Sequence, residues 1–151
     1  MRLLYAFICL FPMLFTSGTS AQIPFVVDSP EWRERVNEIR RAALNKYFLG
    51  EYAPAILEFK KQVRANEIYL EHSKESGRSN AATHYDLVLA YGRIGRAYKS
   101  MKNSKEAKIA FHAARNHSRV AMQNGELTQE QLDNLIDQID KQQRLLYPPQ
   151  Q

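Results

Sequence analysis

The sequence predicts an all-α fold, built from antiparallel helix pairs that stack on one another. Apolar residues recur at three- and four-residue spacing through most of the chain, and no stretch alternates apolar and polar residues for long enough to form a strand. The chain has 151 residues, of which 44% are hydrophobic and 25% charged, a size and composition that suit one compact domain.

The first 21 residues have the features of a secretory signal peptide. Arg2 precedes a largely apolar run over residues 3–15, and Thr19 and Ala21 are small residues suitably placed for cleavage after position 21. The alternative is a retained membrane anchor, but the run is shorter than the roughly 20 residues that span a bilayer. We therefore expect an exported protein, periplasmic or secreted, with no transmembrane segment after cleavage.

Cleavage also changes the chemistry that the chain can offer. The only cysteine, Cys9, lies in the signal, so the mature chain has no thiol for a disulfide, a nucleophile or a metal site. The signal carries one basic and no acidic residue, so the formal charge falls from +5 to +4. In an exported protein this balance favours acidic proteins, anionic polymers or lipid headgroups over nucleic acid as partners, and an ordinary solvated surface explains it more simply.

A helical domain is expected over residues 29–147, after a flexible N-terminus at 22–28 and before a disordered tail at 148–151. Ser29, Pro30 and Glu31 form a helix start, because Ser caps free N–H groups, Pro fits the first turn and a carboxylate suits the helix dipole. One apolar stripe then runs towards Gly50, where the helix ends: Trp32, Val36, Ile39, Ala43 and Tyr47.

The second predicted helix begins near Ala53 or Pro54, since proline is tolerated in a first helical turn. Its stripe weakens after Val63 and consists of Ile56, Phe59, Val63 and Leu70. The polar segment from Ser73 to Asn80 contains Gly77 and is predicted to be a loop.

Three further helices complete the predicted domain. The third ends near Lys102 or Asn103 and has the stripe Tyr85, Val88, Tyr91, Ile94, Ala97 and Tyr98. Ser104 is expected to cap the fourth, which runs to Gly125 and has the stripe Ala107, Phe111, Ala114, Ser118 and Met122.

Thr128 and Gln131 have the spacing of a capping box at the start of the fifth helix. Its apolar side is formed by Leu132, Leu135, Ile136, Ile139 and Leu146, and Pro148 and Pro149 stop it. The opposite side carries Asp133, Asp137 and Asp140, which we expect to face water, as the outer face of a terminal cap does.

The third and fourth predicted helices share a spaced pattern of aromatic, aliphatic and small residues: Tyr91, Ile94, Gly95, Tyr98, Ala107, Phe111 and Ala114. The pattern resembles a tetratricopeptide repeat (TPR), with Tyr in place of the usual Trp and Ile in place of Leu. Gly95 and Ala107 are small enough to let two helices approach, and the aromatic residues fill the space around the contact. An ordinary amphipathic helix pair is the alternative.

An earlier unit resembles the same family less fully, through Ile39, Ala43, the turn Gly50-Glu51-Tyr52, Ala55 and Phe59. Aligning Ala55 with Ala107 gives an offset of 52 residues, against a usual period of about 34. We interpret the difference as elongated helices around residues 73–80, although a simple helical bundle would also produce it. Two repeats are few, so self-association or a partner covering an exposed face is expected.

The sequence gives no support for catalysis or for a cofactor. The four histidines are not spaced as metal ligands on one helix and are expected on the surface or in loops, and HExxH, GxSxG, P-loop and GxGxxG motifs are absent. We therefore predict no catalytic residues, no metal site, no cofactor and no nucleic-acid partner.

The resemblance implies a concave side, lined by the first helix of each pair, that binds a protein or peptide. By position, it implies partner-binding roles for Asn37, Arg40, Leu44, Tyr47, Leu89, Arg93, Arg96 and Lys99. Within this set, Arg93, Arg96 and Lys99 recur every three residues as a basic strip that could attract an acidic partner, or that could simply be solvated. Reversing these three charges is expected to weaken partner capture and to leave the helices intact.

The sequence hypothesis is therefore a non-enzymatic interaction module, acting as an adaptor, an assembly factor or an inhibitor in the cell envelope or outside the cell. The alternative is a binder of anionic envelope polymer or lipid headgroups through the basic helix face.

Overall fold

The computed structural model describes residues 27–76, 80–122, 125–146 and 148–149. Over these ranges the chain forms five helices and no strand: α1 (Pro30–Phe48), α2 (Tyr52–Ser76), α3 (Ala81–Ser100), α4 (Ser104–Met122) and α5 (Gln129–Leu146). The predicted all-α class and the order of the helices are confirmed. The predicted signal peptide, residues 22–26 of the N-terminal segment and the last two residues of the tail lie outside the described residues.

Three predicted helix boundaries have the expected capping groups. The Ser29 side chain accepts a hydrogen bond from the Trp32 N–H at 3.1 Å. After the end of α1, Gly50 has a φ of 79°, a backbone conformation that glycine adopts readily. At the start of α5, the Thr128 N–H donates to Gln131 Oε1 at 2.9 Å and the Gln131 N–H donates to Thr128 Oγ1 at 3.2 Å. These reciprocal bonds form the capping box.

Two boundary predictions are wrong. Ser104 is already inside α4, because Asn103 Oδ1 accepts the Glu106 N–H at 3.3 Å and takes the capping position. Residues 73–76 do not form a loop, since α2 continues to Ser76. Ser73 is compatible with the helix because its hydroxyl donates to the Leu70 carbonyl at 2.9 Å and so remains bonded when buried.

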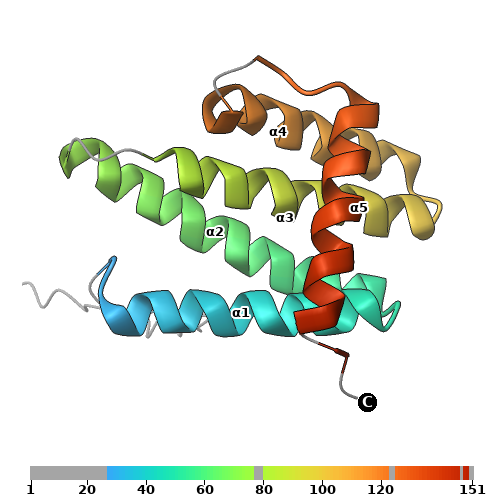
Figure 1. The fold of residues 1–151 in the computed structure, drawn as a ribbon, viewed down its shortest axis with the longest axis horizontal. Coiled ribbons are helices and arrows are strands. Elements are labelled where there is room, and N and C mark those ends of the chain that lie inside the picture. Colours follow the sequence, from blue (N-terminus) through green and yellow to red (C-terminus); the bar gives the residue numbers. More distant parts are fainter. Residues whose placement is uncertain (1–26, 77–79, 123–124, 147, 150–151) are drawn as a thin grey trace, which may run out of the picture.

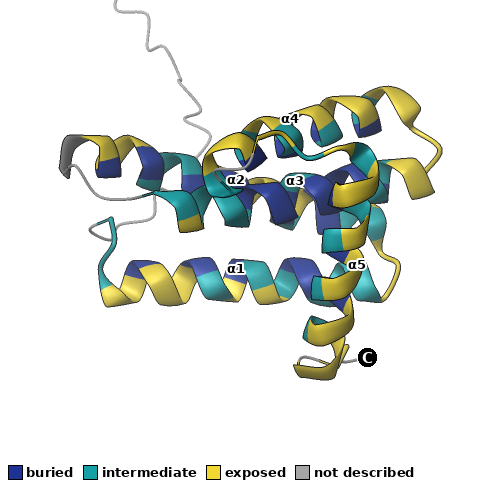
Figure 2. Cartoon of the chain, turned by 45° about the horizontal axis from the view of Figure 1, so that its top comes forward, coloured by how far each residue is buried: buried dark blue, intermediate teal, exposed yellow. Residues whose placement is uncertain are grey.

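Helix α3 occupies the centre of the molecule. Figure 1 shows α2 and α4 flanking α3, α1 packed beside α2, and α5 crossing α3 at a steep angle. Residues 87–90 and 92–95 are buried, and Figure 2 shows α3 as the most continuously buried helix. The sequence predicts one apolar stripe on α3, whereas three neighbouring helices together cover most of its surface.

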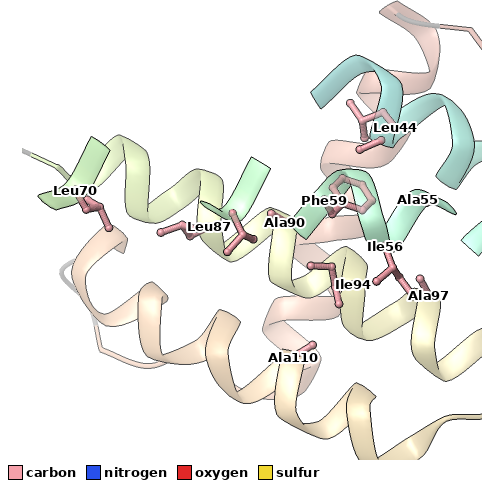
Figure 3. Close-up of a cluster of buried hydrophobic side chains, with 12 residues drawn as sticks. Leu44, Ala55, Ile56, Phe59, Leu70, Leu87, Ala90, Ile94, Ala97 and Ala110 are labelled. Carbon is pink, nitrogen blue, oxygen red and sulfur yellow. The ribbon is translucent and has the colours of Figure 1, made fainter. Parts of the chain in front are cut away.

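The main hydrophobic cluster joins four helices around α2 and α3 (Figure 3). Phe59 of α2 is fully buried in it, together with Leu44 of α1, Leu87 and Ile94 of α3, and Ala110 of α4. A smaller cluster below α5 contains Val88, Leu89, Ala114, Leu132 and Ile136. Leu146 was predicted to belong to the apolar side of α5 but is exposed, and it is the last residue of that helix.

The close approach of α3 and α4 depends on Gly95, as the sequence predicts. A Cβ atom at this position would lie 2.6 Å from two ring carbons of Phe111, well inside van der Waals contact. Ala107 and Ala114 of α4 are also buried and small. The Phe111 ring therefore fills the space that the missing side chain leaves.

Two histidines that were expected on the surface or in loops form a pair across α3 and α4. His84 and His117 are partly buried, and their Nδ1 atoms are 2.9 Å apart. The Tyr91 ring stacks on His117 with ring centroids 5.7 Å apart. Burial lowers the pKa of both histidines, with a further contribution from Lys74 to His84 and from His84 to His117.

No helix in the described ranges combines the length and apolar character needed to cross a membrane.

Replacing Gly95 by Ala is expected to reduce the free energy of unfolding by about 1–3 kcal/mol, because the added methyl group forces Phe111 or α4 to move. The better helix propensity of Ala offsets part of this loss. Urea unfolding followed by circular dichroism measures the change. In a Phe111→Leu background the same substitution should cost clearly less, and an equal cost in both backgrounds would contradict the proposed contact.

The histidine pair predicts a loss of stability on acidification. The folded-state pKa of each histidine lies below its unfolded value of about 6.5, so the unfolded chain binds more protons as the pH falls through and below that value. The free energy of unfolding should therefore decrease between pH 7.5 and 5.5, as measured by urea titration. A His84→Asn/His117→Asn variant should show a shallower decrease, and an unchanged slope would rule out this source.

Candidate functional site

The candidate site is one side of the molecule, the α1–α3 face, to which α1 contributes Asn37 and Arg40 and α3 contributes Arg93 and Arg96. These are four of the eight residues to which the family resemblance assigns partner binding. Helix α5 lies across the C-terminal part of this face (Figure 1) and leaves the part near the start of α1 and α3 uncovered. The two parts have different chemistry.

The deepest polar contact of the covered part joins Arg93 to α5. The Arg93 residue is 1% exposed, and its Nε and Nη2 donate to Asp140 Oδ1 at 2.8 and 2.7 Å. Nη2 also donates to Gln143 Oε1 at 2.6 Å, and the guanidinium carbon lies 6.0 Å from the centre of the Phe59 ring. A buried guanidinium is tolerated only when such charge-assisted bonds replace its hydration.

Arg96 extends the same contact one turn along α3. Its Nη1 donates to Asp137 Oδ1 at 2.6 Å, its Nε to Asp133 Oδ1 at 3.3 Å, and its Nη2 to the Asp133 carbonyl at 2.6 Å. Arg93 and Arg96, two members of the basic strip, therefore bind the aspartates of α5. Lys99, the third member, is exposed near the end of α3.

The expectation that the acidic side of α5 faces water is wrong in part. Asp140 is buried against Arg93, whereas the Asp137 side chain remains 70% exposed even though it contacts Arg96. The physical reason is the orientation of α5, whose boundary between the apolar and acidic sides faces α3. Leu132 and Ile136 therefore pack in the core, while Asp140 and Asp137 bind Arg93 and Arg96.

Gly92 lets α5 approach α3 closely, a role that the sequence analysis did not assign. A Cβ atom there would lie 2.3 Å from Ile136 Cδ1 and 3.6 Å from Leu132 Cδ1. At its other end α5 reaches α1, where the Arg144 guanidinium lies 4.8 Å from the centre of the Phe48 ring. The available signal was a second glycine inside a helix, three residues before Gly95.

Three of the remaining predicted partner-binding residues are covered rather than displayed. Leu44 and Leu89 are buried in the two main hydrophobic clusters. Tyr47 is partly buried and packs edge-on against Phe59, with ring centroids 5.9 Å apart. Burial raises the Tyr47 pKa, and the nearby Asp140 carboxylate raises it further.

The uncovered part of the α1–α3 face contains a pocket of about 260 Å³ between α1, α2 and α3. Asn37 and Arg40 were predicted from the family resemblance, but the α2 and α3 contributions were not, because they come from helices far away in the sequence. The pocket is lined by Asp28, Trp32, Arg33, Val36, Asn37, Arg40, Asn66, Tyr69, Thr83 and Asp86.

Two residues that line this pocket each have a buried hydrogen-bond donor without an acceptor among the described residues. Asn66 is 6% exposed and its Nδ2 is unpaired, and Arg40 Nε is shielded from solvent and also unpaired. Arg40 does use another nitrogen, since its Nη2 donates to Asp86 Oδ2 at 2.5 Å. Burial raises the Asp86 pKa, and the adjacent Arg40 offsets part of that rise.

The charges that line the pocket balance one another. Arg40 pairs with Asp86, and Arg33 Nε donates to Asp28 Oδ1 at 2.9 Å. The lining of the pocket therefore has no surplus of positive charge, and its two unpaired N–H donors are shielded from solvent.

A larger hollow of about 530 Å³ lies over α4 and the start of α5, where it is lined by Ile109, Phe111 and Arg115 among others. It is not on the α1–α3 face, and none of its lining residues combines near-complete burial with an unpaired donor. Over the described ranges no group of three or more His, Cys, Asp or Glu side chains is placed to hold a metal ion.

Comparison of this chain with protein-family models, with curated proteins and with solved structures finds no match in any of the three.

The Arg93–Asp140 contact predicts very different effects for two aspartates on α5. Asp140→Ala leaves a buried guanidinium without its carboxylate and should lower the free energy of unfolding by about 3–5 kcal/mol. Asp137→Ala removes an exposed pair and should cost less than about 1 kcal/mol. Urea unfolding of both variants tests the difference, and equal losses would show that Asp140 does not compensate a buried charge.

The same contact corrects the expectation for the basic strip. A glutamate at position 93 would lie beside Asp140, so Arg93→Glu should destabilise the packing of α5 instead of leaving the helices unaffected.

Proposed function

We propose that this chain is a non-enzymatic protein-interaction module, exported to the cell envelope or the extracellular space, that holds a protein or peptide on the α1–α3 face. In this proposal the molecule acts as an adaptor, an assembly factor or an inhibitor of its partner. It uses no cofactor and performs no chemistry on the partner.

The observation that carries this proposal is the contact of the α1–α3 face with α5. The face accommodates a helix through glycine at position 92, and it fixes that helix by bonds from Arg93 and Arg96 to side-chain and backbone oxygens. A surface that binds a helix of its own chain in this way has the shape and donors suited to holding polypeptide. The adjoining pocket leaves part of the same face open for a second segment.

The proposal includes a TPR-like arrangement of the helices, in which the first helix of each pair would line the binding side. In α3 and α4, Gly95 lies against Phe111 and His84 lies against His117. The residue numbers of the contacting pairs therefore decrease along α3 as they increase along α4, which is expected of an antiparallel helix pair. In the first pair, Trp32 packs near Ala65 and Tyr47 packs on Phe59, with the same trend.

The long second helix also agrees with the interpretation of elongated repeats. Helix α2 has 25 residues and continues to Ser76, which accounts for part of the unusually large offset between the two units. On this reading α1 and α3 are the first helices of the two pairs, and the α1–α3 face is the concave side.

Binding of an anionic polymer or lipid surface is less well supported. That alternative uses the basic strip of α3, but Arg93 and Arg96 already pair with the aspartates of α5. Salt separates the two functions, because polymer binding through exposed charges should collapse as ionic strength rises whereas a packed protein interface should persist.

Site-specific photocrosslinking tests the proposed face. A benzoylphenylalanine at Ala82, which is exposed and one helical turn before Asp86, should give defined adducts with envelope or secreted proteins of the source organism. The same group at Lys105, exposed on α4, serves as the control and should give none of these adducts. Blotting and mass spectrometry identify the adducts, and an identical pattern from both positions would contradict the proposed face.

A further inference from the structure

The part of the chain that forms α3, α4 and the turn between them has a large excess of positive charge. Between Asp86 and Glu126 the sequence has eight lysines and arginines and one acidic residue, Glu106. Four of the eight are arginines that pair with aspartates of α5 or with Glu126. The other four have no acidic partner among the described residues, and we call them the lysine group: Lys99, Lys102, Lys105 and Lys108.

The lysine group lies at one end of the molecule, at the turn between α3 and α4 and just after it. The Lys102 N–H donates to the Lys99 carbonyl at 3.0 Å, and Lys105 and Lys108 are neighbours on one side of α4. All four residues are exposed, and Figure 2 shows exposed residues over this turn and along the outside of α4. Figure 1 shows α1 on the other side of α3 from α4, so this surface is separate from the one that α1 forms.

Two apolar side chains are exposed among these lysines. Met101 is 47% exposed in the turn, and Ile109 is 56% exposed on α4. Ile109 follows Lys108 directly and lies one helical turn after Lys105, so α4 presents all three residues on the same side. Cations that attract anionic headgroups, together with apolar side chains that enter the interface, are the features of a surface that binds an anionic bilayer.

The turn holds one of these lysines in a backbone conformation that favours glycine. In both the α1–α2 turn and the α3–α4 turn, one N–H donates to the carbonyl three residues earlier, at 3.1 and 3.0 Å, and the next N–H donates to the carbonyl five residues earlier, at 2.9 Å. The first of these positions is Gly50, with a φ of 79°, in one turn and Lys102, with a φ of 60°, in the other. A side chain is unfavourable there, so the lysine does not serve the turn itself.

A lipid surface suits this region better than an acidic protein does. Lysine is a compact point charge without the forked geometry by which arginine holds a carboxylate, and the arginines of this region are already paired within the chain. A bilayer also accepts single apolar side chains at the end of a helix pair, whereas a stable protein interface needs a larger packed core.

We infer that the lysine group, with Met101 and Ile109, docks the protein on a bilayer of anionic phospholipid. This inference goes beyond the proposed function, because it concerns a different surface and does not depend on what the α1–α3 face binds. It also differs from the lipid binding considered above, which used the paired Arg93 and Arg96 of α3.

Vesicle binding by the purified full chain tests the inference. The probes are vesicles of equimolar phosphatidylcholine and phosphatidylglycerol and vesicles of phosphatidylcholine alone, at low ionic strength. The readout is the ratio of the two partition constants, because the largely apolar residues 3–15 would bind both kinds of vesicle. The anionic vesicles should bind far more tightly, and Lys105→Gln should lower the ratio by about fivefold. Lys141→Gln removes an exposed lysine of α5 as the matched control and should leave the ratio unchanged.

Lys102→Gly separates vesicle binding from stability. Glycine relieves the unfavourable backbone conformation, so the melting temperature should rise. The same substitution removes one charge from the lysine group, so the ratio of partition constants should fall by about fivefold. A better folded protein that binds anionic vesicles less well is not expected of a lysine that only supports the turn.

A tryptophan at position 101 reports entry of the turn into the bilayer. The native Trp32 is 4% exposed and gives a constant background. The emission of Met101→Trp should move to shorter wavelength with anionic vesicles and stay in place with neutral ones. Leu145→Trp is the control, since Leu145 is 80% exposed on α5, and it should show no such shift.

Four results would overturn this docking surface. These are a partition ratio near one, equal losses from Lys105→Gln and Lys141→Gln, a Lys102→Gly variant that binds as the parent does, and equal emission shifts at positions 101 and 145. Tighter binding of soluble polyglutamate than of anionic vesicles would also overturn it, because the surface would then select acidic polypeptide.

Discussion

The arrangement of this molecule depends on the charge of Arg93 at the centre of its most buried helix. The side chain is 1% exposed, and most of its hydrogen-bonding capacity is directed at Asp140 and Gln143 of α5. Without a carboxylate in that place, a guanidinium could not remain so far from water. Arg93 therefore requires α5 to cross α3, and the glycine at position 92 makes the crossing sterically possible.

This requirement divides the α1–α3 face into two parts with different properties. Where α5 crosses, cations of α3 meet aspartates of the same chain, and Arg144 extends the contact to Phe48 on α1. Nearer the start of α1, the lining charges cancel and unpaired N–H groups remain. The net positive charge of the chain is thus a poor guide to the partner of this face, because its arginines are already neutralised by internal pairs.

Polar groups buried between the helices also make the fold sensitive to its surroundings. The His84–His117 pair joins α3 to α4 beside Tyr91, and its neutral form is the one that burial favours. Between α1, α2 and α3, Asn66 Nδ2 and Arg40 Nε are buried without acceptors among the described residues. Such unpaired buried groups reduce the stability of the fold.

The sequence alone determined the helices and much of their packing, because these depend on local rules. Apolar spacing located α1 to α5, capping residues such as Ser29 and Thr128 located their starts, and Gly95 predicted the contact with Phe111. Within the α1–α3 face, the repeat pattern identified Asn37, Arg40, Arg93 and Arg96 as neighbours of a shared surface. It could not show which of them remains accessible.

Only the tertiary structure decided what those residues meet. Asp140 lies 47 positions after Arg93 and Asp86 lies 46 after Arg40, so no local periodicity connects either pair. An aspartate on the polar side of an amphipathic helix has the same sequence signature whether it faces water or a buried arginine. The angle at which α5 crosses α3 makes that distinction, and it is set by side chains from separate helices acting together.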